Sequence, residues 1–219
     1  METERDISIA IVGGTGNLGQ ALAVRLAAPG IKVTIGSRDP EKARKVVGSI
    51  RKSSGKEGID GKSNQEAVKE AELVVIAVPY EGHTKMVTEL RGQIGGKIVI
   101  DAVVPLNKGK PFTPPAGSAL LEAQEILGTE TPVVGALHNI SASDLQNPGA
   151  PLGDVLVCGD NGDAKERVME IIRRLGARAL DAGPASNAYI VEGLTGVLIH
   201  LNRKYKSKHA SVKVTGIGG

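Results

Sequence analysis

A glycine-rich turn near the N-terminus constrains the fold of this chain more than any other feature. The turn, GTGNLG at residues 14–19, directly follows the short β-branched run ISIAIVG at residues 7–13. After it, leucines recur at helical spacing from residue 18, and this segment closes with Pro29 and Gly30. A strand, a G-x-G-x-x-G turn and a helix in this order are typical of the first βαβ unit of a dinucleotide-binding sheet.

Each glycine of this turn has a separate predicted role. Gly14 allows the tight turn, Gly16 lets the backbone approach a pyrophosphate, and Gly19 lets the helix pack closely on the strand. The backbone N–H groups of residues 15–18 then face the diphosphate at the positive end of the helix dipole. We therefore predict a dinucleotide phosphate site at this turn.

The residues at the end of the second predicted strand favour NADP over NAD. An Asp or Glu that binds the ribose 2′-hydroxyl usually stands about 20 residues beyond the glycine turn. Here Ser37 and Arg38 take that place, and Lys42 follows one helical turn later. A guanidinium offers a planar fork of donors that suits a phosphate, whereas a carboxylate would repel one. We therefore predict that Ser37, Arg38 and Lys42 bind the 2′-phosphate of NADP.

The rest of the chain continues the alternation of strands and helices. Further strands are predicted at 32–36, 73–79, 97–105, 132–137, 155–159 and 177–183, and helices at 39–50, 63–71, 83–90, 118–127, 164–175 and 188–205. We expect loops at 51–62, with at most a weak strand, and at 106–117. This alternation predicts an α/β fold, a doubly wound, mostly parallel sheet of the Rossmann dinucleotide-binding type with a small C-terminal α/β extension.

Composition excludes several other classes of protein. Hydrophobic residues make up 41% and charged residues 23% of the chain, which favours a packed globular protein over a disordered one. The net charge of +3 argues against a dedicated nucleic-acid binder. The single cysteine, Cys158, excludes an internal disulfide and a multi-cysteine zinc site, and no metal site is predicted. Because no secretory signal and no apolar run of about 20 residues is present, we expect a cytoplasmic protein that binds no membrane.

Several segments together resemble one enzyme family. They are IAIVGGTGNLGQALAVRLA, IGSRDPEKA, VVIAVPYEGH, GALHNISASDL and LDAGPASNAYIVEGLT, which span almost the whole chain. The chain resembles the NADPH-dependent reductases of the 8-hydroxy-5-deazaflavin coenzyme, coenzyme F420. The resemblance implies reversible hydride transfer between NADP(H) and the deazaflavin, usually in a homodimer or higher homo-oligomer. It also implies an NADP-binding domain at 1–140 and a small C-terminal part at 141–219 that completes the deazaflavin site, with a single compact domain as the alternative.

The resemblance also assigns site residues. The pyrophosphate loop corresponds to Thr15, Gly16, Asn17 and Leu18, and the 2′-phosphate site to Ser37, Arg38 and Lys42. A strand-end segment beside the cofactor corresponds to Val78, Pro79 and Tyr80, and a segment over the two rings to His138, Asn139, Ile140, Ser141 and Ala142, with Ala142 closest to the nicotinamide. Ala210 begins a segment that closes the deazaflavin side, where Ser211 and Val212 replace the glycine and isoleucine that are frequent in the family.

Hydride transfer between planar rings depends mainly on positioning, so no general acid is required. His138, beside Asn139, is the one candidate catalytic side chain, because it could donate to a bound ring. The alternative is a structural histidine in a loop. His83 is expected to be an ordinary residue at a helix start.

Other functions stay open at this stage. A flavin, a ferric chelate or an imine could replace the deazaflavin as second substrate, and related domains occur in ferric reductases. A protein that senses NADP without catalysis is the alternative of another class. The sequence does not fix the direction of hydride transfer or the number of subunits.

A basic run near the C-terminus has two interpretations. It contains Arg203, Lys204, Lys206, Lys208 and Lys213. It could be a solvated helix end, where cations are favourable. Alternatively, it could attract the anionic phosphate and glutamate tail of the deazaflavin.

Overall fold

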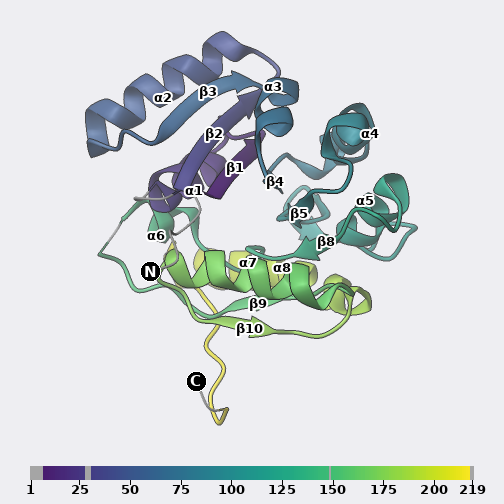
Figure 1. The fold of residues 1–219 in the computed structure, drawn as a ribbon. Coiled ribbons are helices and arrows are strands. Elements are labelled where there is room, and N and C mark those ends of the chain that lie inside the picture. The colour runs from purple at the N-terminus through teal and green to yellow at the C-terminus, as the bar shows by residue number, and fades with distance from the viewer. Residues whose placement is uncertain (1–6, 28–30, 148, 218–219) are drawn as a thin grey trace, which may run out of the picture.

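The computed structural model describes residues 7–27, 31–147 and 149–217 and contains one large parallel sheet (Figure 1). The strand order is β3-β2-β1-β4-β5-β8, and every neighbouring pair is parallel. The strands are β1 (Ile7–Val12), β2 (Ile31–Ser37), β3 (Ile59–Ser63), β4 (Leu73–Ile76), β5 (Ile98–Asp101) and β8 (Val133–Gly135). The predicted doubly wound α/β fold is therefore confirmed.

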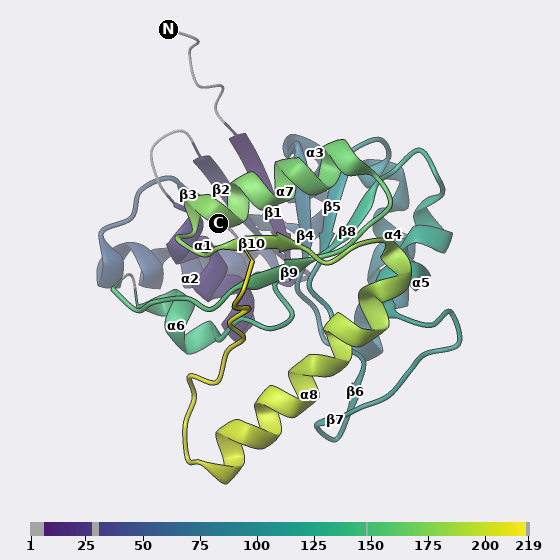
Figure 2. The ribbon, with the colours of Figure 1, turned by 90° about the horizontal axis from the view of Figure 1, so that it is seen from below.

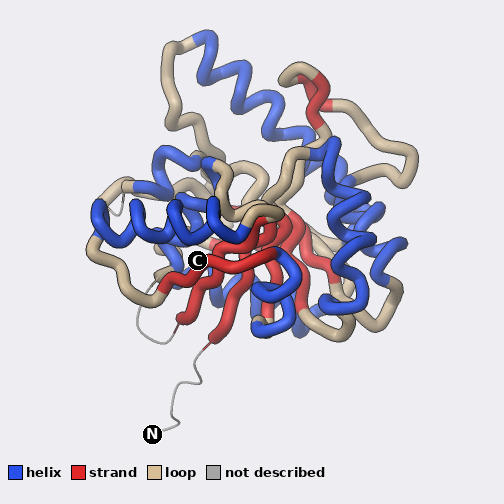
Figure 3. Tube along the Cα trace, turned by 90° about the horizontal axis from the view of Figure 1, so that it is seen from above, coloured by secondary structure: helices blue, strands red, loops and turns tan. Residues whose placement is uncertain are grey.

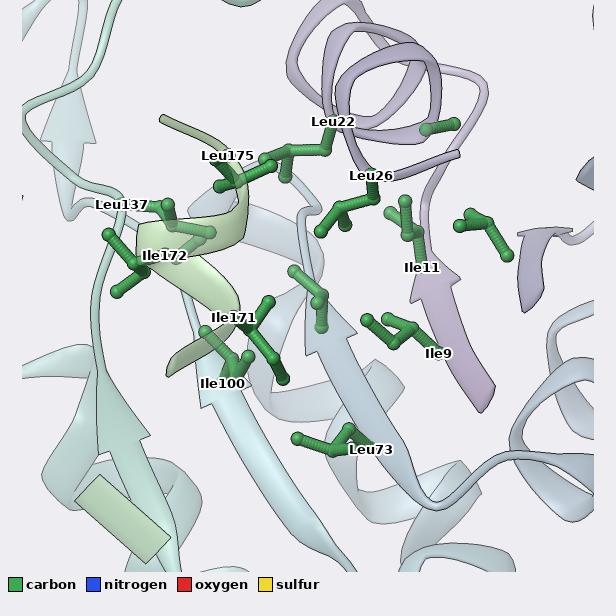
Figure 4. Packing of buried hydrophobic residues seen from close by; sticks show 14 of the residues in the cluster. Ile9, Ile11, Leu22, Leu26, Leu73, Ile100, Leu137, Ile171, Ile172 and Leu175 are labelled. Atoms are coloured by element: carbon green, nitrogen blue, oxygen red, sulfur yellow. The ribbon is translucent and has the colours of Figure 1, made fainter. Parts of the chain in front are cut away.

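Helices cover both faces of the sheet, as Figure 3 shows from above. They are α1 (Asn17–Leu26), α2 (Pro40–Ser54), α3 (Asn64–Glu70), α4 (His83–Ile94), α5 (Ala119–Leu127), α6 (Ala142–Gln146), α7 (Gly162–Arg174) and α8 (Ala188–Lys204). On one face α1, α2 and α7 bury their apolar sides, and on the other α3, α4 and α5 do so. In Figure 4, Leu175, at the C-cap of α7, lies near Leu22 of α1, and Ile171 of α7 lies near Ile100 of β5; all four belong to the first of these cores.

Local signals fix several helix ends. The Asp39 carboxylate accepts the backbone N–H groups of Glu41 and Lys42 at 2.9 and 3.3 Å, and Pro40 occupies the first helical position, so α2 begins there. Ser63 and Glu66 form the predicted capping box at the start of α3. The predicted end of α1 at Pro29 and Gly30 lies outside the described residues.

Two segments expected to be loops contain more structure. Helix α2 runs on to Ser54, and the edge strand β3 follows it. Strand β3 was hard to detect because its sequence, IDGKS, contains one large apolar residue and pairs with β2 only. The other segment contains a short antiparallel hairpin, β6 (Leu106–Asn107) and β7 (Lys110–Pro111).

The C-terminal part adds a small second sheet. Its strands β9 (Val155–Val157) and β10 (Ala179–Asp181) are parallel. An antiparallel bridge joins Gly135, at the end of β8, to Cys158. Residues of β9 and α7 share one hydrophobic cluster with β1 and α1, and the domain boundary at residue 140 stays a prediction. Helix α8 and the hairpin extend beyond the carboxyl ends of the central strands (Figure 2).

Candidate functional site

The glycine turn is held by short backbone contacts. The Gly14 N–H donates to the carbonyl oxygens of Ile11 and Gly36 at 3.1 and 3.0 Å, which ties the turn to β1 and β2. A Cβ built on Gly19 would lie 2.5 Å from the Gly14 Cα, so only glycine allows α1 to come this close. Gly16 is the N-cap of α1 and makes no side-chain capping bond. The first N–H groups of α1 therefore stay available to an anion.

A cavity of about 670 Å³ opens beside this turn at the carboxyl ends of β1, β2 and β4. Of the predicted site residues, Thr15, Gly16, Ser37, Arg38, Lys42, Val78 and Pro79 line it. The remaining lining residues are Gly13, Asp39, Asn64, Ala77, Glu81, Gly82, Lys85, Met86 and Glu89. Sequence analysis missed this second set, although Asn64 stands directly after β3 and Asp39 two residues after β2, where ligands of parallel sheets bind.

Four predicted residues of the turn region do not line this cavity. Gly14 and Gly19 instead form the close contact between turn and helix, while Asn17 and Leu18 begin α1. Tyr80, predicted to lie beside the cofactor, directs its hydroxyl to Glu122 at 3.0 Å.

The end of β2 presents cations on one side of the cavity. Arg38 and Lys42 are both exposed, and Ser37 is buried with its hydroxyl accepting the Asp39 N–H at 3.2 Å. The Asp39 carboxylate faces the first N–H groups of α2, so that helix end partly neutralises its charge. A smaller cavity of about 250 Å³ adjoins Ser37 and Arg38 and is also lined by Asn64 and Gln65.

A second site lies between the β8–α6 loop and α8. Its cavity, of about 200 Å³, is lined by all five residues from His138 to Ala142, by Thr195, Leu198, Ile199 and Asn202 of α8, and by Lys208 and Ala210. The Ser141 hydroxyl donates to the Lys208 carbonyl oxygen at 2.7 Å, and the Ala210 N–H donates to Asn202 Oδ1 at 3.0 Å. Ala210 and the loop from His138 to Ala142 therefore line one cavity.

His138 is buried in this second site. Its carbonyl oxygen accepts the Thr195 hydroxyl at 2.8 Å, but neither ring nitrogen has a partner among the described residues. Burial lowers the pKa of His138 to about 4, so its imidazole is neutral near pH 7. A neutral ring can donate one hydrogen bond, and whether it donates to a ligand stays a prediction.

A buried cluster of ionisable side chains lies between α4, α5 and the end of β5, and sequence analysis missed it. His83 Nε2 is 2.7 Å from Asp101 Oδ2, both side chains are fully buried, and His83 Nδ1 is 3.8 Å from Glu122 Oε2. Burial alone would lower the pKa of His83, but the carboxylates of Asp101 and Glu122 raise it above its ordinary value. Although His83 begins α4 as predicted, it also joins this helix to the end of β5.

Glu192 of α8 belongs to the same region. Its carboxylate accepts the N–H groups of Ala119 and Leu120 at 3.0 and 3.1 Å, at the start of α5. Burial nevertheless raises the pKa of Glu192 to about 8. A buried acid that holds its proton near neutral pH adds little negative charge to this side of the site.

The described residues form neither a metal-binding cluster nor a membrane-spanning helix. No group of three or more His, Cys, Asp or Glu side chains in the described ranges is placed to hold a metal ion. Within those ranges, no helix combines the length and hydropathy that crossing a bilayer requires.

Comparison with known proteins identifies the family. The family model described as NADP oxidoreductase, coenzyme F420-dependent, matches residues 8–105. The F420-dependent NADP reductase of Methanocaldococcus jannaschii is 36% identical over an alignment that covers 96% of this chain and 99% of that protein. The chain belongs to the F420-dependent NADP reductase family. This confirms the predicted family.

Two further proteins are similar to this chain. A solved structure from Arthrobacter sp. FB24, described as a candidate F420-dependent NADP reductase, has a TM-score of 0.83 and 26% identity, covering 95% of this chain and 99% of that one. Metalloreductase STEAP3 of Rattus norvegicus is 31% identical over 83% of this chain, which corresponds to 35% of that longer protein.

Proposed function

We propose that this F420-dependent NADP reductase transfers a hydride reversibly between NADP(H), bound in the 670 Å³ cavity, and coenzyme F420, bound toward the loop at His138. The observation that carries the proposal is the meeting of three features in one cavity. The uncapped start of α1 faces it, Arg38 and Lys42 flank it at the end of β2, and the small residues Ala77 and Val78 line it after β4.

Charge supports NADP as the nucleotide. Arg38 and Lys42 supply two cations where an NAD-binding sheet usually has a carboxylate. Ser37 adds a hydroxyl, and the start of α2 points its dipole toward the same place. A phosphate on the adenosine ribose would therefore accept hydrogen bonds from the Arg38 guanidinium, the Lys42 ammonium and the Ser37 hydroxyl.

The second substrate is assigned to the other cavity because of its shape and composition. Ile140, Ala142, Leu198 and Ile199 give it apolar walls, and His138, whose ring nitrogens have no partner among the described residues, also lines it. A volume of about 200 Å³ holds only part of a tricyclic ring, so the ring would extend toward the larger cavity. That arrangement would bring the nicotinamide and the deazaflavin face to face near Ala142.

The reaction makes modest chemical demands on the chain. A hydride leaves C4 of the dihydronicotinamide and forms a C–H bond on the deazaflavin, and one proton from solvent completes the reduced ring. The chain has to hold the two carbons about 3–3.5 Å apart and exclude water from between them. Buried loops with small side chains serve this purpose, and no side chain is assigned as a general acid.

Turnover tests the proposal. Purified protein is mixed anaerobically with NADPH and, in separate reactions, with coenzyme F420, FMN or a ferric chelate, and the absorbance of each acceptor is followed. We expect rapid bleaching of coenzyme F420 and little change in the others. Tight NADPH binding without reduction of any acceptor would contradict the proposal and favour the sensor without catalysis.

A second candidate acceptor has one observation in its favour. The resemblance to Metalloreductase STEAP3 at 31% identity covers most of this chain, so the same nucleotide-binding scaffold occurs in a protein named for metal reduction. Reduction of the ferric chelate, with or without added FMN, at a rate above that of coenzyme F420 would select this candidate.

We also propose that the protein acts in the cytoplasm as a homo-oligomer. Ile190, Val197 and Leu201 form an exposed apolar stripe along α8, which a second copy could cover. Light scattering after size-exclusion chromatography tests this, because a monomer mass at micromolar concentration would contradict it.

A further inference from the structure

The hairpin and the end of α8 together form a cationic arm, defined here as residues 104–112 and 196–208. The arm extends beyond the carboxyl ends of the sheet strands (Figure 2). It holds six of the 27 Lys and Arg residues of the chain and none of the 24 Asp and Glu residues. The six are Lys108, Lys110, Arg203, Lys204, Lys206 and Lys208, and all are exposed. The whole chain carries only +3, so the six positive charges of the arm are a local excess that acidic residues elsewhere in the chain offset.

Close packing fixes the two halves of the arm against each other. A Cβ built on Gly196 would lie 2.5 Å from the Pro111 side chain, and one built on Gly109 would lie 2.9 Å from the Arg203 guanidinium. Phe112, which follows the hairpin, packs edge-on against Tyr80 with ring centroids 5.2 Å apart. The hairpin is therefore anchored both to α8 and to the segment after β4.

The positive charges of the arm have no acidic partner among the described residues. Elsewhere, buried stems and ion pairs hold lysines in place, as in the bond of 2.9 Å between Lys165 and Asp181. By contrast, no ion pair joins any of the six arm side chains to another residue in the described part of the chain. Like charges gathered without counterions repel one another, and an anionic ligand would relieve that repulsion.

The arm is continuous with the second cavity. Lys208 and Asn202 belong to the arm and also line the cavity beside His138. Lys208 therefore places one cation of the arm at the wall of this cavity. The 2′-phosphate cations Arg38 and Lys42 lie instead at the end of β2, in a different cavity.

We propose that the cationic arm binds the anionic side chain of the deazaflavin coenzyme, that is, its phosphodiester and glutamyl carboxylates. This inference rests on the proposed function, since it assumes that the ring of that coenzyme occupies the cavity at His138. The deazaflavin ring accepts or donates the hydride. The positive potential of the arm increases the affinity for the coenzyme and its association rate.

The experiment compares two charge-reversed proteins on two substrates. The test protein carries Lys110→Glu with Lys204→Glu, and the control carries Lys52→Glu with Lys69→Glu. All four lysines are exposed, and both proteins lose the same charge. The control pair stands near the ends of α2 and α3, at the opposite edge of the sheet. The substrates are coenzyme F420 and the corresponding 8-hydroxy-5-deazaflavin nucleoside, which lacks phosphate and glutamates.

We expect the test protein to show a KM for coenzyme F420 about 5–10-fold higher at low salt, falling to less than about 2-fold at 0.5 M salt. Its KM for the nucleoside and for NADPH should equal that of the parent, and the control protein should match the parent throughout. Lys110→Gln with Lys204→Gln gives a milder form of the same result if reversal at Lys204 weakens the end of α8.

Each other outcome contradicts a specific claim. An unchanged KM for coenzyme F420 in folded test protein, or an equal rise for the nucleoside, would overturn the role of the arm. A changed molecular mass without a changed KM would assign the arm to subunit contacts instead. Failure of the parent protein to reduce either deazaflavin would contradict the proposed function rather than this inference.

Discussion

Replacing Gly19 by alanine tests the contact between α1 and the glycine turn. The new Cβ would lie 2.5 Å from the Gly14 Cα and 2.9 Å from the Gly14 carbonyl carbon and oxygen. All three are backbone atoms, so no side-chain rotation can relieve the contact. Carbon atoms pack about 3.5–4.0 Å apart, so α1 has to move away by about 1 Å. Overpacking of this kind costs about 1–3 kcal/mol, of which alanine in a helix returns about 0.5–1 kcal/mol.

The displaced helix should also bind nucleotide less tightly. Loss of one hydrogen bond to a charged group costs about 1.5–3 kcal/mol, so we expect at least about a tenfold weaker NADP affinity. Urea unfolding gives the stability and titration calorimetry gives the affinity. Gly48→Ala is the matched control: it lies within α2 with no atom within 4 Å of the new Cβ, and it should raise stability by about 0.5–1 kcal/mol without changing the affinity. If Gly19→Ala behaved like this control, the packing argument would be wrong.

Three further changes test the electrostatics. The pKa of Glu192 is raised to about 8 in the folded protein, so the folded protein keeps a proton that the unfolded chain loses. The free energy of unfolding should therefore fall between about pH 4.5 and 8, by up to about 1.4 kcal/mol per pH unit. Glu192→Gln should flatten this slope in urea titrations. The hydrogen bond from Arg178 lowers the pKa of Asp154 in the folded protein. Asp154→Asn should therefore lower the free energy of unfolding by about 1 kcal/mol at pH 7, and by little at a pH below the folded pKa of the carboxyl. An equal loss of stability at the two pH values would refute this. Tyr80→Phe removes the donor to Glu122 and should lower stability by about 1–3 kcal/mol in thermal unfolding; an unchanged melting temperature would show that the bond is dispensable.

Local patterns were sufficient for the nucleotide half of the site. The strand, turn and helix at residues 7–26, together with Arg38, stand close in sequence and each needs only its neighbours to adopt its structure. The fold class followed from the alternation of such units. Strand β3 was not predicted because contacts with its neighbours in space, rather than its own residues, make it a strand. One such contact is the close approach of α2, since a Cβ on Gly61 would lie 2.7 Å from the Ala43 backbone.

Contacts between residues far apart in the sequence could not be predicted. Asp101 ends a strand that reads as uniformly apolar, and His83 stands 18 residues earlier, so nothing local links them. Their contact depends on how α4 returns over the sheet. In the same way, Lys110 and Lys204 meet in one arm only because Pro111 packs against Gly196.

The binding preference between NADPH and NADH tests the central claim most directly. Titration calorimetry compares both dinucleotides on the parent protein and on the double variant Arg38→Ala with Lys42→Ala. Two charge-assisted contacts to the 2′-phosphate predict that the parent binds NADPH at least about 100-fold more tightly than NADH, and that the double variant loses most of this preference while NADH affinity stays the same. Equal binding of the two dinucleotides by the parent would contradict the account.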